Sequence, residues 1–118
     1  MPELAEVEYY RRQWNVGMGE KVLGLQINPR SRNFRDCDTG ALERYLPNSR
    51  LLRSEAHGKR MLFQFSGNLW LGVHLGMTGE LFVGSPGDAK AKHEHLILVQ
   101  KKRRLIYKDP RQFGAIRF

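Results

Sequence analysis

The sequence predicts a mainly β domain in which an antiparallel β-sandwich is flanked by an N-terminal helix and a second short helix. Short segments in which apolar residues alternate with polar or small ones recur at roughly ten-residue spacing along most of the chain. Only two segments carry the periodicity or the capping residues of a helix. Strands that follow one another without intervening helices favour an antiparallel sandwich over a parallel βαβ array.

The first helix is predicted from Leu4 to Trp14, where apolar residues recur every three to four positions. Glutamates occupy its beginning and Arg11 and Arg12 follow, which is the order that the helix dipole favours. Glycines at positions 17 and 19 end it. The acidic residues of this segment therefore have a structural explanation that needs no catalysis.

The second helix is predicted over residues 38–47, with Asp38 or Thr39 as its cap and Pro47 as its end. Three of the remaining segments have the alternation of strands, two more form a pair of strands joined by the basic turn KKRR, and GAIRF is the expected last strand. Residues 84–92, GSPGDAKAK, have the composition of a flexible loop. The predicted strands are 23–27, 61–65, 69–75, 95–100, 104–108 and 114–118.

Length and composition indicate one intracellular domain with a polyanionic partner. The 118 residues suit a single core, and no apolar run approaches the roughly 18 residues that a membrane helix needs, so no membrane partner is expected. The lone Cys37 cannot form an internal disulfide, which favours a reducing compartment. A formal net charge of +8 and a pI of about 10.1 favour nucleic acid as a partner. A monomer is expected.

No metal or cofactor is expected in this chain. His93 and His95 lack the spacing of a helical zinc motif, and in a strand they would share a face without a third ligand nearby. Cys37 has no adjacent histidine that could activate its thiol. The sequence also has no glycine-rich phosphate loop of the Walker or dinucleotide type.

Pro2 is the first candidate for chemistry. Removal of Met1 would leave a secondary amine, and an α-amino group titrates at about pH 8, far below lysine, so a sizeable fraction is neutral and nucleophilic at neutral pH. Such an amine can condense with a sugar C1′ to give an iminium, and Glu3 beside it could transfer protons. The alternative is that Pro2 merely begins the helix. If Met1 stays, the Pro2 nitrogen is an amide and cannot attack.

Three further motifs carry candidate binding residues. Lys59 is a candidate catalytic residue that precedes a strand in HGKRMLFQF, where it could reach a phosphate or act as an acid. The alternative is that it lies in solvent as an ordinary cation. In VHLGMTGEL, His74 lies opposite the apolar face, and the glycine-flanked Met77 could project as a wedge or fill the core. In KDPRQFGAIRF, an Asp-Pro turn could present Arg111 and Phe113 to an orphaned base, or Phe113 could be a core residue.

Taken together, PELAEVE, GKRM, HLGMTG and DPRQFG resemble, in order and spacing, the N-terminal domain of the formamidopyrimidine-DNA glycosylase and endonuclease VIII family. The resemblance covers Met1 to Phe118 and is closer to the formamidopyrimidine branch. It implies a β-sandwich flanked by helices. It also implies a base-excision repair enzyme that removes oxidised purines, 8-oxoguanine and formamidopyrimidines, from damaged double-stranded DNA and nicks the strand by β,δ-elimination.

The resemblance also implies a role for each candidate residue. Pro2 would be the Schiff-base nucleophile, Glu3 its acid/base partner, and Glu6 a second carboxylate that organises the site. Positions that would contact phosphates or fill the void left by the flipped base come from the other motifs. The implied phosphate contacts are Lys59 and His74, and the implied void-filling residues are Met77, Arg111 and Phe113.

The sequence departs from the family pattern in three ways. Ala5 replaces a second proline, and Gln112 replaces the second arginine that many members carry after DPR. The family continues into a helix-two-turns-helix domain and usually a four-cysteine zinc finger. Neither lies in residues 1–118, so zinc is expected only in that further region and not in this chain. We therefore expect one catalytic domain that alone acts weakly or not at all. Two alternatives stay open: a non-catalytic nucleic-acid-binding module, and a basic sandwich that serves protein assembly.

Overall fold

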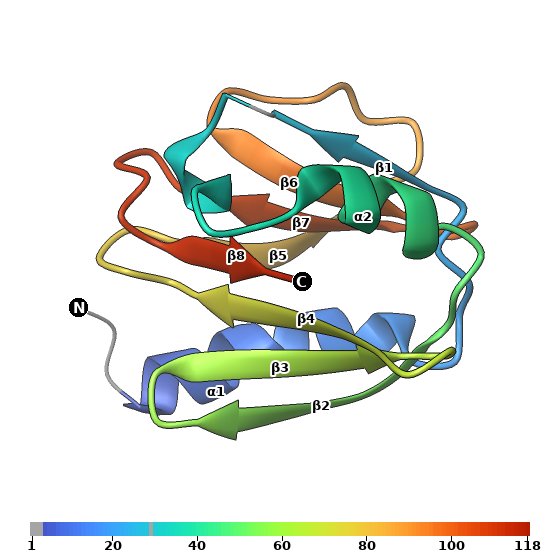
Figure 1. Cartoon of the computed structure of the whole chain (residues 1–118), viewed down its shortest axis with the longest axis horizontal. Coiled ribbons are helices and arrows are strands. Elements are labelled where there is room, and N and C mark those ends of the chain that lie inside the picture. Colours follow the sequence, from blue (N-terminus) through green and yellow to red (C-terminus); the bar gives the residue numbers. More distant parts are fainter. Residues whose placement is uncertain (1–3, 29) are drawn as a thin grey trace.

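The computed structural model describes residues 4–28 and 30–118, which form two four-stranded antiparallel sheets and two α-helices (Figure 1). Pro2 and Glu3 lie outside the described residues. The elements in chain order are α1 (Leu4–Gln13), a 3-10 turn (Trp14–Gly17), β1 (Gly24–Ile27), a second 3-10 turn (Arg32–Phe34), α2 (Thr39–Tyr45), β2 (Leu51–His57), β3 (Arg60–Phe65), β4 (Leu69–His74), β5 (Glu80–Gly84), β6 (Glu94–Val99), β7 (Arg104–Lys108) and β8 (Ala115–Arg117).

The two sheets form the predicted sandwich. One has the strand order β1-β6-β7-β5 and the other the order β2-β3-β4-β8, and every pairing is antiparallel. Alternate residues of β3 and β4 point inward, so Met61, Phe63 and Phe65 are fully buried together with Leu71. The fold class expected from the sequence is thus confirmed.

Both helices contribute to the core between the sheets. Val7 is the buried residue of α1, and Leu42 is that of α2. Asp38 caps α2 through a 3.0 Å hydrogen bond from the Ala41 amide to its carboxylate, as the sequence predicts. Trp14, just after α1, is completely buried and its ring centroid lies 4.8 Å from that of Phe63.

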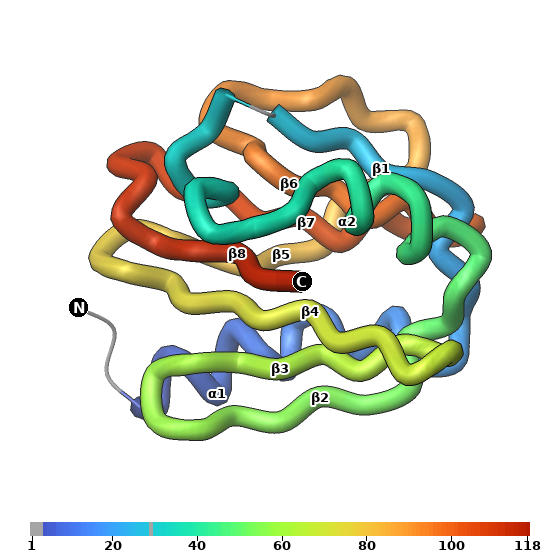
Figure 2. The backbone as a smooth tube through the Cα atoms, in the orientation of Figure 1, coloured from blue at the N-terminus to red at the C-terminus, as the bar shows by residue number. Residues whose placement is uncertain are grey.

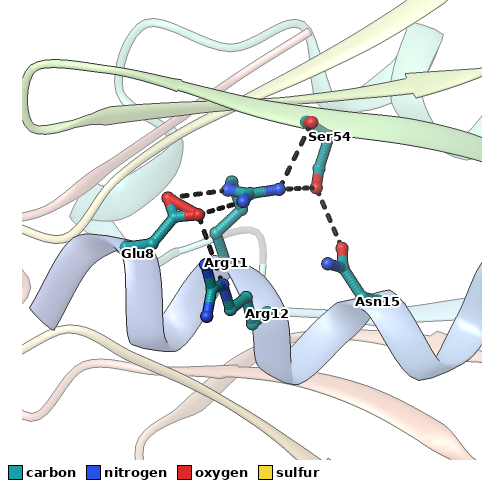
Figure 3. A network of polar contacts seen from close by, with 5 residues as sticks. All are labelled: Glu8, Arg11, Arg12, Asn15 and Ser54. Atoms are coloured by element: carbon teal, nitrogen blue, oxygen red, sulfur yellow. Dashed lines mark hydrogen bonds and ion pairs between the residues drawn. The ribbon is translucent and has the colours of Figure 1, made fainter. Parts of the chain in front are cut away.

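A polar network holds α1 against β2 (Figure 3). Glu8 accepts from the guanidinium of Arg11 and forms an ion pair with Arg12. Arg11 Nη1 donates to Ser54 Oγ over 2.8 Å, and Ser54 Oγ lies 2.9 Å from Asn15 Oδ1. Glu8 therefore has a structural role, and it anchors the helix whose first turn carries Glu6.

The structure contains two strands that the sequence patterns did not predict, β2 and β5. In β2, a register shift between Leu51 and Arg53 breaks the alternation, and Leu52 is 50% exposed. In β5 the apolar run is only three residues long and directly follows Gly79 and Glu80. His93 has φ of 67° and lies in the turn before β6, outside the strand predicted to begin at His95, so the two histidines do not share a strand face.

Three connections lie at the same end of the sandwich (Figure 2). These are the β2–β3 turn, the β4–β5 loop and the β7–β8 loop, and α1 begins at the same end (Figure 1). Among the described residues, no helix is long and apolar enough to cross a membrane.

Candidate nucleic-acid interface

Lys59 and His74 come together at this end of the sheet. Gly58 has φ of 61°, which glycine adopts without strain, and this allows a two-residue turn that places Lys59 directly before β3. Arg60, the next residue, is paired with His74 at the end of β4. Burial, with the charges of Arg60 and Lys59, lowers the pKa of the His74 imidazole.

More cations surround this histidine than the motifs indicated. The charges of Arg35 and Arg117 also act on His74. Arg35 comes from the segment after the second 3-10 turn, and Arg117 from β8. Several positive groups around one half-buried imidazole form a surface suited to phosphate oxygens.

The β4–β5 loop and the β7–β8 loop pack against each other through two glycines. A Cβ on Gly76, which has φ of 63°, would lie 2.6 Å from both the Gly114 nitrogen and the Phe113 carbonyl carbon. A Cβ on Gly114 would lie 2.4 Å from the His74 carbonyl oxygen. The close approach of the two backbones therefore requires glycine at both positions.

Asp109 fixes the base of the β7–β8 loop. It is completely buried, and its Oδ1 accepts from Thr78 Oγ1 at 2.6 Å and from the Gln112 amide at 3.1 Å. Its Oδ2 accepts from the Gly114 amide, Asn33 Nδ2 and the Tyr107 hydroxyl at 2.9 to 3.0 Å. Burial would raise the pKa of Asp109, but these hydrogen bonds outweigh it and hold the pKa below its usual range.

The tips of the joined loops carry exposed side chains. Met77 is 54% exposed and Phe113 is 44% exposed, so neither is the core residue that the alternatives allowed. The guanidinium carbon of Arg111 lies 4.9 Å from the centre of the Phe113 ring, which is a cation–π distance. Exposed apolar and aromatic side chains on well-fixed loops can insert between stacked nucleic-acid bases without first being released from the protein core.

Gln112 has a structural role of its own. Its Oε1 accepts from the Arg32 amide at 2.9 Å, and its backbone has φ of 56°. Arg32 Nη2 also donates to the Arg111 carbonyl oxygen at 3.3 Å. An arginine at position 112 could not accept from the Arg32 amide, so the departure from the family pattern exchanges a cation for a loop anchor.

Glu6 lies exposed in the first turn of α1. Burial and, after it, the carboxylates of Glu80 and Glu6 raise the pKa of the Tyr10 phenol. Pro2 and Glu3, the predicted nucleophile and its partner, lie outside the described residues. No group of three metal-ligating side chains occurs within residues 4–28 and 30–118.

Comparison with known proteins identifies the family. The family model described as the formamidopyrimidine-DNA glycosylase N-terminal domain matches residues 1–116 of this chain. The chain belongs to the formamidopyrimidine-DNA glycosylase family. The resemblance inferred from the four sequence motifs is thereby confirmed.

Relatives in the family match nearly the whole of this chain. The formamidopyrimidine-DNA glycosylase of Burkholderia mallei is 37% identical over 122 residues, and that of Halorhodospira halophila is 33% identical over 117 residues. In both cases the match covers 98% of this chain and 43% of the relative. The chain thus spans less than half the length of these relatives.

Solved structures of the same family share the fold. The Lactococcus lactis Fpg in complex with DNA containing an abasic site matches with a TM-score of 0.89 and 26% identity, over 98% of this chain and 43% of that one. The complex of wild-type Lactococcus lactis Fpg with DNA containing an oxidised pyrimidine matches with the same values.

Sequence reasoning missed the residues of this family domain that hold the candidate site in place. Asn33 donates to Asp109, to Tyr107 and to the Gly114 carbonyl oxygen, yet nothing in SRNFRD distinguishes it from an ordinary loop asparagine. Arg60 could have been found, because it alternates with Met61 and Phe63 and so had to lie on the same outer face as a strand-paired His74.

Proposed function

We propose that this chain is the catalytic N-terminal domain of a bifunctional DNA glycosylase and AP lyase that excises oxidised purines from damaged double-stranded DNA. Family membership supports this, and so do the DNA complexes described for the Lactococcus lactis relatives. The observation that carries the proposal is the pair of joined loops, which present Met77, Arg111 and Phe113 beside the cations around His74.

In the proposed binding step, DNA lies across this end of the molecule. Lys59 and His74 contact phosphates near the lesion, and the neighbouring arginines add positive charge. Met77, Arg111 and Phe113 occupy the space of the flipped base, with Arg111 facing the base that lost its partner. Flipping costs a few kcal/mol, and side chains that fill the void offset part of that cost.

In the proposed chemical step, the Pro2 amine bonds to the sugar C1′ while the glycosidic bond breaks and the damaged base leaves. Glu3 transfers protons during ring opening, and Glu6 is the second carboxylate. The resulting iminium withdraws electrons, so that loss of the C2′ proton expels the 3′ phosphate, and a second elimination expels the 5′ phosphate.

Borohydride trapping on abasic-site duplex tests the nucleophile directly, because reduction converts the iminium into a stable amine. The chain with Met1 removed, verified by mass spectrometry, is expected to form a covalent adduct at high protein concentration. Pro2→Gly should lose the adduct. Glu3→Gln should lose excision of 8-oxoguanine and keep trapping at a preformed abasic site.

The matched control is the same chain with one extra residue before Met1, which keeps the Pro2 nitrogen in a peptide bond. Equal trapping by the extended chain would overturn Pro2 as the nucleophile. Duplex binding without any adduct in the processed chain would favour the non-catalytic binding module instead.

A further inference from the structure

A pocket of about 280 Å³ lies on the outer face of the β2-β3-β4-β8 sheet. Leu62 is paired with Gly72, and Gly72 with Arg117, so these residues of β3, β4 and β8 lie side by side on that face. Gly72 has no side chain, and this leaves a depression in the middle of the sheet. Trp70 and Phe118 also line it.

The walls of the pocket combine aromatic and positively charged groups. Trp70, Leu62 and Phe118 supply apolar surface, whereas Arg60 and Arg117 supply cations. The carboxylate of Asp36 lies 3.9 Å from Arg117 Nη2, and both side chains are more than half exposed. This mixture suits a planar aromatic group that carries negative charge.

The Trp70 ring is contacted by Arg53 of β2. The guanidinium carbon of Arg53 lies 5.5 Å from the centre of the Trp70 ring. Arg53 Nε in turn donates to Gln64 Oε1 over 2.8 Å. This contact favours one orientation of the ring, so a ligand that stacks on it has less side-chain motion to restrict.

We propose that this pocket binds one nucleotide unit, with its base on Trp70 and Leu62 and its phosphate between Arg60 and Arg117. The volume is at the small end for ligand pockets, which suits one ring system better than a protein segment. A second copy of the chain would bring like charges together. The inference goes beyond the proposed function, because it requires neither a lesion nor the Pro2 amine.

The nucleotide can come from a DNA strand or from solution. His74 lines the pocket, and its Nδ1 accepts from the Gly76 amide of the β4–β5 loop over 3.1 Å. The pocket is therefore continuous with the surface proposed to hold phosphates, and a strand bound there could place a neighbouring unpaired nucleotide in it. Free mononucleotides have the same chemistry.

The experiment follows the indole N–H signals of the protein by NMR during titration with dAMP. The chain has two tryptophans, and Trp14 is fully buried with its Nε1 donating to the Ile106 carbonyl oxygen, so it is an internal control. The Trp70 signal is expected to shift and saturate while the Trp14 signal stays. Deoxyribose 5-phosphate, which lacks the base, should shift the Trp70 signal far less than dAMP does.

Variants at the pocket floor separate binding there from general anion attraction. A Cβ at position 72 would make only ordinary contacts, 3.6 Å from Arg117 Cβ and 3.7 Å from Leu62 Cδ2. Gly72→Leu fills the pocket and should weaken dAMP binding about tenfold or more, since base stacking is lost. Gly72→Ala is the matched control and should bind nearly as well as the parent. Arg117→Gln, on an exposed side chain, should weaken binding without disturbing the fold.

A single-stranded oligonucleotide that shifts Trp70 at a much lower concentration than dAMP assigns the pocket to a strand, and equal affinities per nucleotide assign it to free nucleotides. The proposal is overturned if dAMP causes no saturable shift of Trp70, or if Gly72→Leu binds as the parent does. It is also overturned if an acidic aromatic peptide binds as tightly as dAMP, because the pocket would then recognise protein.

Discussion

Asp109 is the residue on which the geometry of the candidate interface depends most. Each of its two carboxylate oxygens accepts from a backbone N–H, Gln112 on one side and Gly114 on the other. The hydroxyls of Thr78 and Tyr107 can rotate, but backbone N–H groups cannot. If an asparagine side chain replaced this buried carboxylate, its NH2 group would face one of these backbone N–H groups, and two hydrogen-bond donors would point at each other.

We expect Asp109→Asn to lower the free energy of unfolding by about 2 to 4 kcal/mol, because either orientation of the amide leaves a buried N–H without an acceptor. Urea denaturation measures the loss. Asp88→Asn is the matched control, since the exposed Asp88 accepts from one backbone amide, that of Ser85, and should change stability by less than about 1 kcal/mol. Equal losses in the two variants would show that the hydrogen bonds of Asp109 are not what stabilises the loop.

At the scale of elements, the contact between the β4–β5 loop and the β7–β8 loop brings the exposed tips together. Gly76 and Gly19 both have positive φ, 63° and 78°, but they differ in surroundings. A Cβ on Gly76 collides with the backbone of Phe113 and Gly114, whereas a Cβ on Gly19 meets nothing within 4 Å. Comparing alanine variants at these two glycines therefore separates the cost of backbone strain from the cost of lost packing between the loops.

Gly19→Ala is expected to lose about 1 kcal/mol of stability from its left-handed backbone alone. Gly76→Ala should lose about 1 to 3 kcal/mol more, since the two loops must separate to admit the methyl group. Amide hydrogen exchange at Phe113 and Gly114 should accelerate only in Gly76→Ala. If both variants show the same loss and the same exchange, the loops are not coupled through Gly76.

The elements also explain how far the sequence could predict this molecule. Alternation identified β3 and β4 because their inward side chains are apolar and buried. The pair β6 and β7 was predicted instead from two apolar segments on either side of the basic turn KKRR, and these strands are buried along nearly their whole length. Alternation failed for β2, an edge strand whose Leu52 points outward, and for β5, whose apolar run is too short to alternate. An edge strand has a neighbour on one side only and its sequence can carry a weaker pattern, but edge position alone does not decide the outcome, because the edge strands β1 and β8 were predicted.

The candidate site was predictable only in part, for a related reason. Met77, Arg111 and Phe113 lie in motifs flanked by turn residues, so their projection could be inferred locally. Asn33 acts across 76 residues of sequence when it donates to Asp109. Contacts of that kind depend on the tertiary fold, and no periodicity along the chain encodes them.

For the molecule as a whole, two histidines make stability depend on pH. Burial lowers the pKa of His95, although a contact of its Nε2 with the Asp109 carbonyl oxygen at 3.0 Å acts the other way. Burial also lowers the pKa of His74, with Arg60 and Lys59. In the unfolded chain a histidine titrates at about pH 6.5. Below that pH the unfolded state binds more protons than the folded state, so acid destabilises the fold.

We therefore expect the free energy of unfolding to fall between about pH 7.5 and 5.5, by up to about 1.4 kcal/mol per pH unit for each histidine that stays neutral in the fold. Asp109 acts in a lower range, because its pKa is held down and its contribution is lost only as pH falls below about 4. His95→Gln keeps a donor for the Asp109 carbonyl oxygen and removes one titrating site, so its stability should fall less over the same interval. Urea midpoints at three pH values measure both slopes, and parallel slopes for variant and parent would exclude His95 as a source of the acid sensitivity.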